Sequence, residues 1–148
     1  MKRPFAMFST VFKMLLPVVL ASFFTATSTM ADADVISIEL NKTEDTEQGC
    51  RPLFLFDNRS GHQLNAFQAE IVLFDDKGVY SQQLLLDMAP LYEDKKVVAS
   101  FLISDVACDD IGSMLVNALP SCASDAGEDL DCLAMLDVSS KSSIPLEK

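Results

Sequence analysis

The chain has 148 residues, of which 22 are acidic and 11 are basic, and its formal net charge is −11 at pH 7. This length suits a single domain. An acidic chain is repelled by phosphate groups, so we expect neither nucleic acid nor an anionic membrane surface as a partner.

The N-terminal residues are typical of a secretory signal peptide. Lys2 and Arg3 form a short basic region, an apolar stretch runs from Met14 to Phe24, and small or hydroxyl residues lead to Ala31. We expect cleavage after Ala31, with cleavage after Ala33 as the alternative. An uncleaved anchor is less favoured, because the apolar run is shorter than the roughly 20 residues of a spanning helix.

This pattern predicts a signal peptide over residues 1–31, a β domain over 32–138 and a polar, partly mobile tail over 139–148. Removal of the leader would take away 3 of the 11 bases and none of the 22 acids, which leaves a net charge of −14. We expect a periplasmic or secreted protein that makes no membrane contact after cleavage.

Apolar and polar residues alternate with a period of two after the leader, which predicts β-strands rather than helices. In chain order, strands are expected over residues 35–40, 50–56, 67–73, 79–86, 97–103 and 111–119. The polar stretches expected to form loops are 41–49, 88–96 and 121–131. The Asp75-Asp76-Lys77-Gly78 segment predicts a hairpin turn, because glycine accepts the positive φ that such a turn needs.

Residues 132–138 have two interpretations. We favour a seventh strand, with alternate residues from Cys132 to Val138 on one face. The rival is a short helix that groups Leu130, Leu133 and Leu136.

Seven short strands separated by turn signals predict an all-β fold, an immunoglobulin-like antiparallel β-sandwich. The length after the leader is close to the roughly 100 residues of that fold. Tryptophan is absent, so the expected core rests on aliphatic residues together with Phe54, Phe56, Phe67, Phe74 and Phe101.

All four cysteines, Cys50, Cys108, Cys122 and Cys132, follow the leader, which predicts two disulfides formed in an oxidising compartment. Of three possible pairings we favour Cys50–Cys108 with Cys122–Cys132. In an immunoglobulin-like order the starts of the second and sixth strands lie at the same end of facing sheets, and the second bond closes the acidic loop. No Cys-x-x-Cys motif or close pair of zinc ligands is present, so a structural role is expected.

No residue constellation points to catalysis or to a bound cofactor or metal. His62 is the only histidine and follows Gly61 in a turn, where a solvated side chain is usual. The adjacent pairs Asp75-Asp76 and Asp109-Asp110 are explained by turn and loop chemistry. The acidic loop lacks the EF-hand pattern that calcium binding would favour, although its carboxylates include Asp125, Glu128, Asp129 and Asp131.

Two tripeptides, Asn41-Lys42-Thr43 and Asn58-Arg59-Ser60, have the sequence of N-glycosylation sites. They matter only if the protein is made in a eukaryotic secretory pathway.

The order of signals from Cys50 to Phe101 resembles FxLYD-type, immunoglobulin-like modules of bacterial envelope proteins. The resemblance lies in the aromatic strand 53–56, the turn 58–61 and the segment 71–78, with Phe74 where such modules carry tyrosine. The segments 108–112 and 115–117 also resemble small uncharacterised exported proteins of alphaproteobacteria. These likenesses imply a β-sandwich and a periplasmic location, and they carry no catalytic residues to transfer.

The function predicted is that of a non-enzymatic exported domain, a protein-interaction or accessory module for another envelope or secreted protein. Strand pairing at the segment Val35 to Leu40 is the expected mode of binding. The alternative is a secreted inhibitor or ligand-binding protein that uses the acidic loop 121–131. A hydrolase centred on His62 is the third hypothesis.

Overall fold

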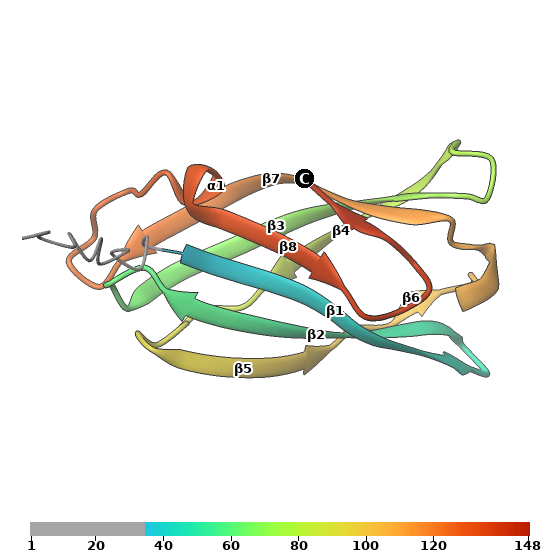
Figure 1. The fold of residues 1–148 in the computed structure, drawn as a ribbon, viewed down its shortest axis with the longest axis horizontal. Coiled ribbons are helices and arrows are strands. Elements are labelled where there is room, and N and C mark those ends of the chain that lie inside the picture. Colours follow the sequence, from blue (N-terminus) through green and yellow to red (C-terminus); the bar gives the residue numbers. More distant parts are fainter. Residues whose placement is uncertain (1–34) are drawn as a thin grey trace, which may run out of the picture.

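Alternating apolar residues form two β-sheets that pack face to face, and this confirms the predicted all-β sandwich (Figure 1). A computed structural model describes residues 35–148. The expected signal peptide, with both of its cleavage sites, lies outside the described residues.

The first sheet, here called sheet A, has five strands in the order β5-β2-β1-β8, with β6 also paired to β2. Its strands are β1 (Val35–Thr46), β2 (Gly49–Arg59), β5 (Lys95–Ser100), β6 (Ile103–Ser104) and β8 (Leu136–Ser140). All pairs are antiparallel except β1 with β8, which is parallel.

The second sheet, sheet B, has four strands in the order β4-β3-β7-β9. Its strands are β3 (Leu64–Phe74), β4 (Tyr80–Asp87), β7 (Ser113–Ser124) and β9 (Leu146–Glu147). The pair of β7 with β9 is parallel, and the others are antiparallel. The sandwich therefore has nine strands rather than seven, and two of its pairings are not antiparallel.

The core lies between the two sheets and is built from the inward positions that the alternation predicts. Phe56 of sheet A meets Phe67 of sheet B edge to face, with ring centroids 6.3 Å apart, and both are fully buried. Phe54 is also fully buried and lies 6.1 Å from the half-buried Phe101. Phe74 is not a core residue, because it follows the inward-facing Leu73 and so faces the outside of sheet B.

The prediction of a loop over the polar segment 41–49 is wrong. After a bulge between Leu40 and Lys42, β1 continues to Thr46 and pairs with β2 as far as Gly49. The residues that β1 contributes to this ribbon are polar and none of them is buried, so no apolar alternation marks them as a strand.

The predicted hairpin at residues 75–78 is present. Asp75 Oδ1 accepts hydrogen bonds from the backbone amides of Lys77 and Val79, at 2.9 and 2.8 Å. Gly78 has a φ of +73°, a conformation that favours glycine.

The last predicted strand is divided between a helix and a strand. Residues Cys132–Met135 form the single-turn helix α1, which Asp131 caps by accepting a hydrogen bond from Ala134 N, and only Leu136–Ser140 form β8. Both expectations for this segment were therefore right in part. The fifth expected strand, 97–103, is likewise divided, between β5 and β6.

The boundary expected at residue 138 is not a boundary of the domain. β8 continues to Ser140, and β9 pairs with β7 in sheet B. Ile144 and Leu146 are buried in the core. The segment expected to be a polar tail therefore completes the sandwich.

The packing predicts that alanine substitutions of two phenylalanines of β3 lower the free energy of unfolding by different amounts. Phe67→Ala empties a fully buried site between the sheets, so we expect a loss of about 3–5 kcal/mol of unfolding free energy. Phe74→Ala removes a partly exposed ring from an outer face, so its cost should be about 1 kcal/mol. Urea denaturation of the two variants measures both values, and equal costs would contradict the assigned faces.

Candidate functional site

The cysteines pair as Cys50–Cys108 and Cys122–Cys132, which is the pairing that the sequence favours. Cys50 lies at the start of β2, while Cys108 begins a short 3-10 helix, η1 (Cys108–Asp110), between β6 and β7. The bond therefore joins sheet A to the segment that leads into β7 of sheet B, with Cys108 just before that strand, as expected.

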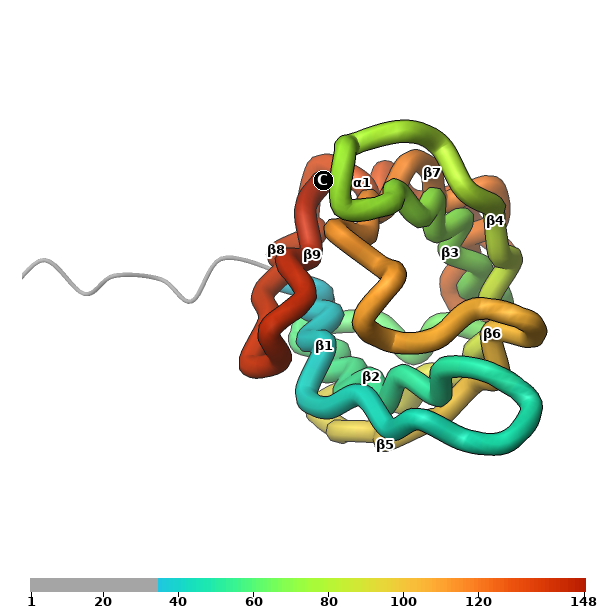
Figure 2. The backbone as a smooth tube through the Cα atoms, turned by 90° about the vertical axis from the view of Figure 1, so that its right-hand side faces the viewer, coloured from blue at the N-terminus to red at the C-terminus, as the bar shows by residue number. Residues whose placement is uncertain are grey.

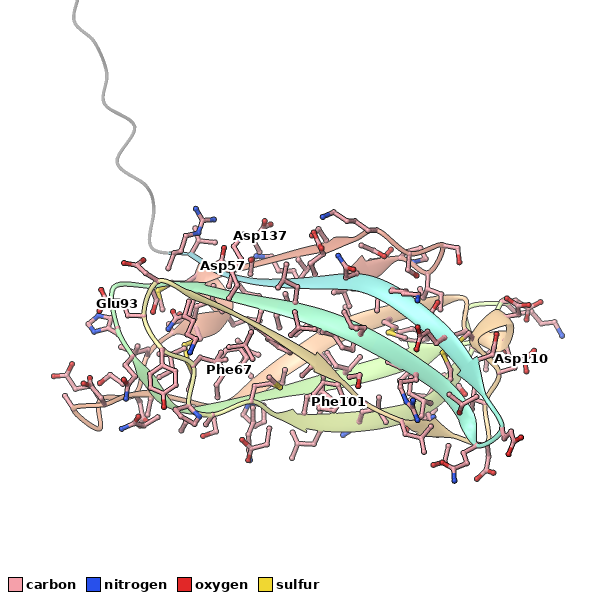
Figure 3. The ribbon with its side chains drawn as sticks, turned by 90° about the horizontal axis from the view of Figure 1, so that it is seen from below. Asp57, Phe67, Glu93, Phe101, Asp110 and Asp137 are labelled. Carbon is pink, nitrogen blue, oxygen red and sulfur yellow. A yellow bond between two sulfur atoms is a disulfide. The ribbon has the colours of Figure 1, made fainter. Side chains whose placement is uncertain are left out.

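The crossover from Asp105 to Gly112 is held to both sheets. Asp105 N donates to Gln48 O in the β1–β2 turn, at 3.0 Å, and Gly112 N donates to Phe74 O in sheet B, at 2.9 Å. Asp45 Oδ1 accepts a hydrogen bond of 2.8 Å from Cys108 N. Asp110 lies at this end of the sandwich, and Glu93 at the opposite end (Figure 3).

Gly49 explains how β6 approaches β2 beside the first disulfide. Its φ is +137°, and a Cβ at this position would collide with the carbonyl oxygen of Ile103. Only glycine therefore permits the pairing of Gly49 and Cys50 with the two residues of β6.

The acidic segment expected over residues 121–131 is shorter in the structure, because β7 extends to Ser124. The Cys122–Cys132 bond closes it, and Leu130 N donates to Cys122 O at 3.0 Å. Its four carboxylates are exposed. Over residues 35–148, no three acidic, histidine or cysteine side chains converge in a way that could hold a metal ion.

The turn after β2 is built on a buried polar network centred on Asn58. Its Nδ2 donates to His62 O at 2.8 Å and to Leu91 O at 3.0 Å, and its Oδ1 accepts from Ser60 Oγ at 2.7 Å. Asn58 is fully buried, so the second sequon is closed to glycosylation in the folded chain. The first sequon asparagine, Asn41, is half-buried and donates to Glu39 Oε1 at 2.7 Å.

His62 contributes to this turn through its carbonyl group, while its side chain is exposed. In the part of the chain that the structure describes, no hydrogen bond joins its imidazole to another residue, and no pocket lies beside it or elsewhere. The geometry therefore supplies neither a hydroxyl nor a carboxylate partner for a hydrolytic mechanism at His62.

One side of the sandwich is closed by its last two strands. β8 in sheet A and β9 in sheet B lie side by side in Figure 2, where the chain passes directly from one sheet to the other. The first strand is therefore not an edge over Ile36–Leu40, because β8 pairs with it there. The predicted binding edge Val35 to Leu40 is wrong for this reason.

Four strands end the two sheets, and two of them, β8 and β9, lie against each other. The uncovered edges within the described chain are therefore β4, which pairs only with β3, and β5, which pairs only with β2. A free edge presents unpaired amide and carbonyl groups that another strand can bind, and natural proteins commonly protect it with lysine or proline. β5 begins with Lys95 and Lys96. β4 has neither residue type, and its sequence YSQQLLLD is uncharged up to Asp87.

The unprotected edge also exposes apolar surface. Tyr80 is 59% exposed and Leu85 is 58% exposed, although both belong to β4. The sequence analysis does not single out this strand as an uncovered edge, because its apolar residues indicate a strand but not the strand's place in the sheet. Its combination of eight residues with no lysine, arginine or proline was the available signal.

No family model, no curated protein and no solved structure matches this chain. Among the described residues, no helix is both long and apolar enough to cross a membrane. The two disulfides and the free edge strand are thus the features from which a function has to be inferred.

The disulfides make a prediction about stability. They close segments with sequence separations of 58 and 10 residues. Loop-closure entropy then predicts a loss of about 4 kcal/mol for Cys50→Ala with Cys108→Ala, and of about 3 kcal/mol for Cys122→Ala with Cys132→Ala. Urea denaturation of the two double variants tests this order. A peptide linking Cys50 to Cys122, found by non-reducing peptide mapping, would contradict the pairing.

Proposed function

We propose that this chain is a non-enzymatic protein-interaction module of the periplasm or the cell exterior. Two disulfides support a location outside the reducing cytosol. The absence of a pocket and of a hydrogen-bonded imidazole over residues 35–148 supports binding rather than catalysis. The immunoglobulin-like assignment and the likeness to FxLYD-type modules remain part of this proposal, supported by two packed sheets of short strands.

The free edge of β4 is the observation that carries the proposal. The eight residues of β4 have one unpaired backbone side and include the exposed Tyr80 and Leu85, so they can accept an added strand from a partner. Main-chain hydrogen bonds would supply affinity, and the alternate side chains of β4 would supply specificity. The acidic loop is a weaker candidate, because its carboxylates do not converge on a ligand site among the described residues.

Leu85→Lys tests this proposal, because a lysine on an edge strand hinders pairing with another strand. A tagged wild-type chain should capture a reproducible partner from an envelope extract, and Leu85→Lys should reduce the amount captured by about tenfold or more. Mass spectrometry identifies the partner.

Leu133→Lys is the matched control, since Leu133 is also exposed, at 44%, but lies on α1 rather than on an edge. This variant should capture as much partner as the wild type. Equal capture by all three proteins, or no reproducible partner, would be incompatible with binding at β4. Slower hydrogen exchange at β4 amides in the complex separates edge pairing from indirect effects.

A further inference from the structure

Positive charge is segregated between the two sheets. The strands of sheet B contain no lysine and no arginine. Every basic residue that lies in a strand belongs to sheet A, namely Lys42, Arg51, Arg59, Lys95 and Lys96. The outer surfaces of the sandwich therefore differ in the charge that they offer to a partner.

The carboxylates on the outside of sheet A are mostly neutralised by ion pairs. Asp57 Oδ2 lies 3.5 Å from Arg59 Nε and 3.5 Å from Lys96 Nζ. Glu39 Oε2 lies 3.1 Å from Lys141 Nζ. A hydrogen bond from Asn41 and the contact with Lys141 lower the pKa of Glu39. These acids already have cationic partners within the chain.

Two carboxylates on the outer face of sheet B, those of Glu70 and Asp87, are held instead by neutral amides. Glu70 accepts hydrogen bonds from Gln83 at 2.9 Å and from Asn117 at 2.5 Å. Asp87 accepts one from Gln68 at 3.0 Å. An amide donor fixes the position of a carboxylate without supplying an opposite charge, so neither group has a cationic partner among the described residues.

These charges lie beside the exposed apolar side chains of β4. Glu70 of β3 is in register with Leu85, and Gln68 is in register with Asp87, so all four side chains share the outer face of sheet B. An added strand would lie about 4.8 Å beyond β4. Its side chains would then meet Leu85 and Asp87 directly, with Glu70 one strand further away.

We propose that β4 binds an extended segment of a cationic protein in which an apolar residue and a basic residue stand two positions apart, so that both side chains lie on the outer face of sheet B. An apolar side chain of the segment packs against Leu85, and a lysine or arginine lies opposite Asp87 and near Glu70. This inference rests on the proposed function and adds the chemistry of the partner. A second copy of the chain is a poorer occupant, because it has the same large negative charge.

The test uses the ¹⁵N-labelled chain, expressed from its full sequence, and two short blocked peptides. Both peptides have threonine at every second position; at the positions between, one peptide alternates valine with lysine and the other alternates valine with glutamate, so that each presents valine and a charged residue on the same face. We expect the lysine peptide to shift the amide signals of β4, with an affinity that falls as salt is raised. The glutamate peptide should leave these signals unchanged.

Asp87→Asn and Glu70→Gln should each weaken binding of the lysine peptide by about two- to fivefold, the range for an exposed charge pair. Asp137→Asn is the matched control, because it removes an exposed carboxylate from β8 in sheet A. Its affinity for the peptide should equal that of the wild type. Leu85→Lys should abolish the shifts.

The other outcomes separate this inference from the proposed function. Equal binding of both peptides at β4 would overturn the charge preference and leave edge binding intact. A captured partner sensitive to Leu85→Lys, together with no peptide binding, would also overturn the inference alone. Self-association through β4, seen by sedimentation and lost in Leu85→Lys, would replace the cationic partner with a second copy.

Discussion

The contact between Phe56 and Phe67 is the interaction on which the rest of the structure depends. Each phenylalanine stands on a central strand of its sheet, and each is fully buried where the sheets meet. Since neighbouring residues of a strand face opposite ways, burial of these rings determines which residues of β2 and β3 face outward. The outer surfaces, including the acids of sheet B, follow from this arrangement.

Closure of the sandwich is unequal, and this inequality has functional consequences. The C-terminal segment closes one side, because β8 and β9 lie together and bury Ile144 and Leu146. No such segment covers β4 or β5 within the described chain. Both edges expose apolar side chains, Val98 on β5 and Tyr80 and Leu85 on β4. Only β5 carries lysines, so the two edges are not equivalently protected against an added strand.

Local patterns predicted the elements best where one face is buried. Residues 67–73 alternate cleanly, and β3 has the inward face that this alternation predicts. The part of β1 beyond Leu40 was missed because its residues are all polar, so no apolar period marks it. Residues Cys132–Met135 form the helical turn α1 instead of the expected strand, because the Cys122–Cys132 bond and the Asp131 cap hold this turn.

The amino-acid sequence alone determined the all-β class, the inward faces of the central strands and the turn at residues 75–78, because each depends on near neighbours in the chain. Tertiary structure decided which strands became edges. The edge of β1 that was expected to be free is covered, because β8, about a hundred residues further along the chain, pairs with it. Strand order depends on contacts between distant segments, and no local period encodes such contacts. For that reason only the folded chain brings Leu85, Asp87 and Glu70 onto one surface.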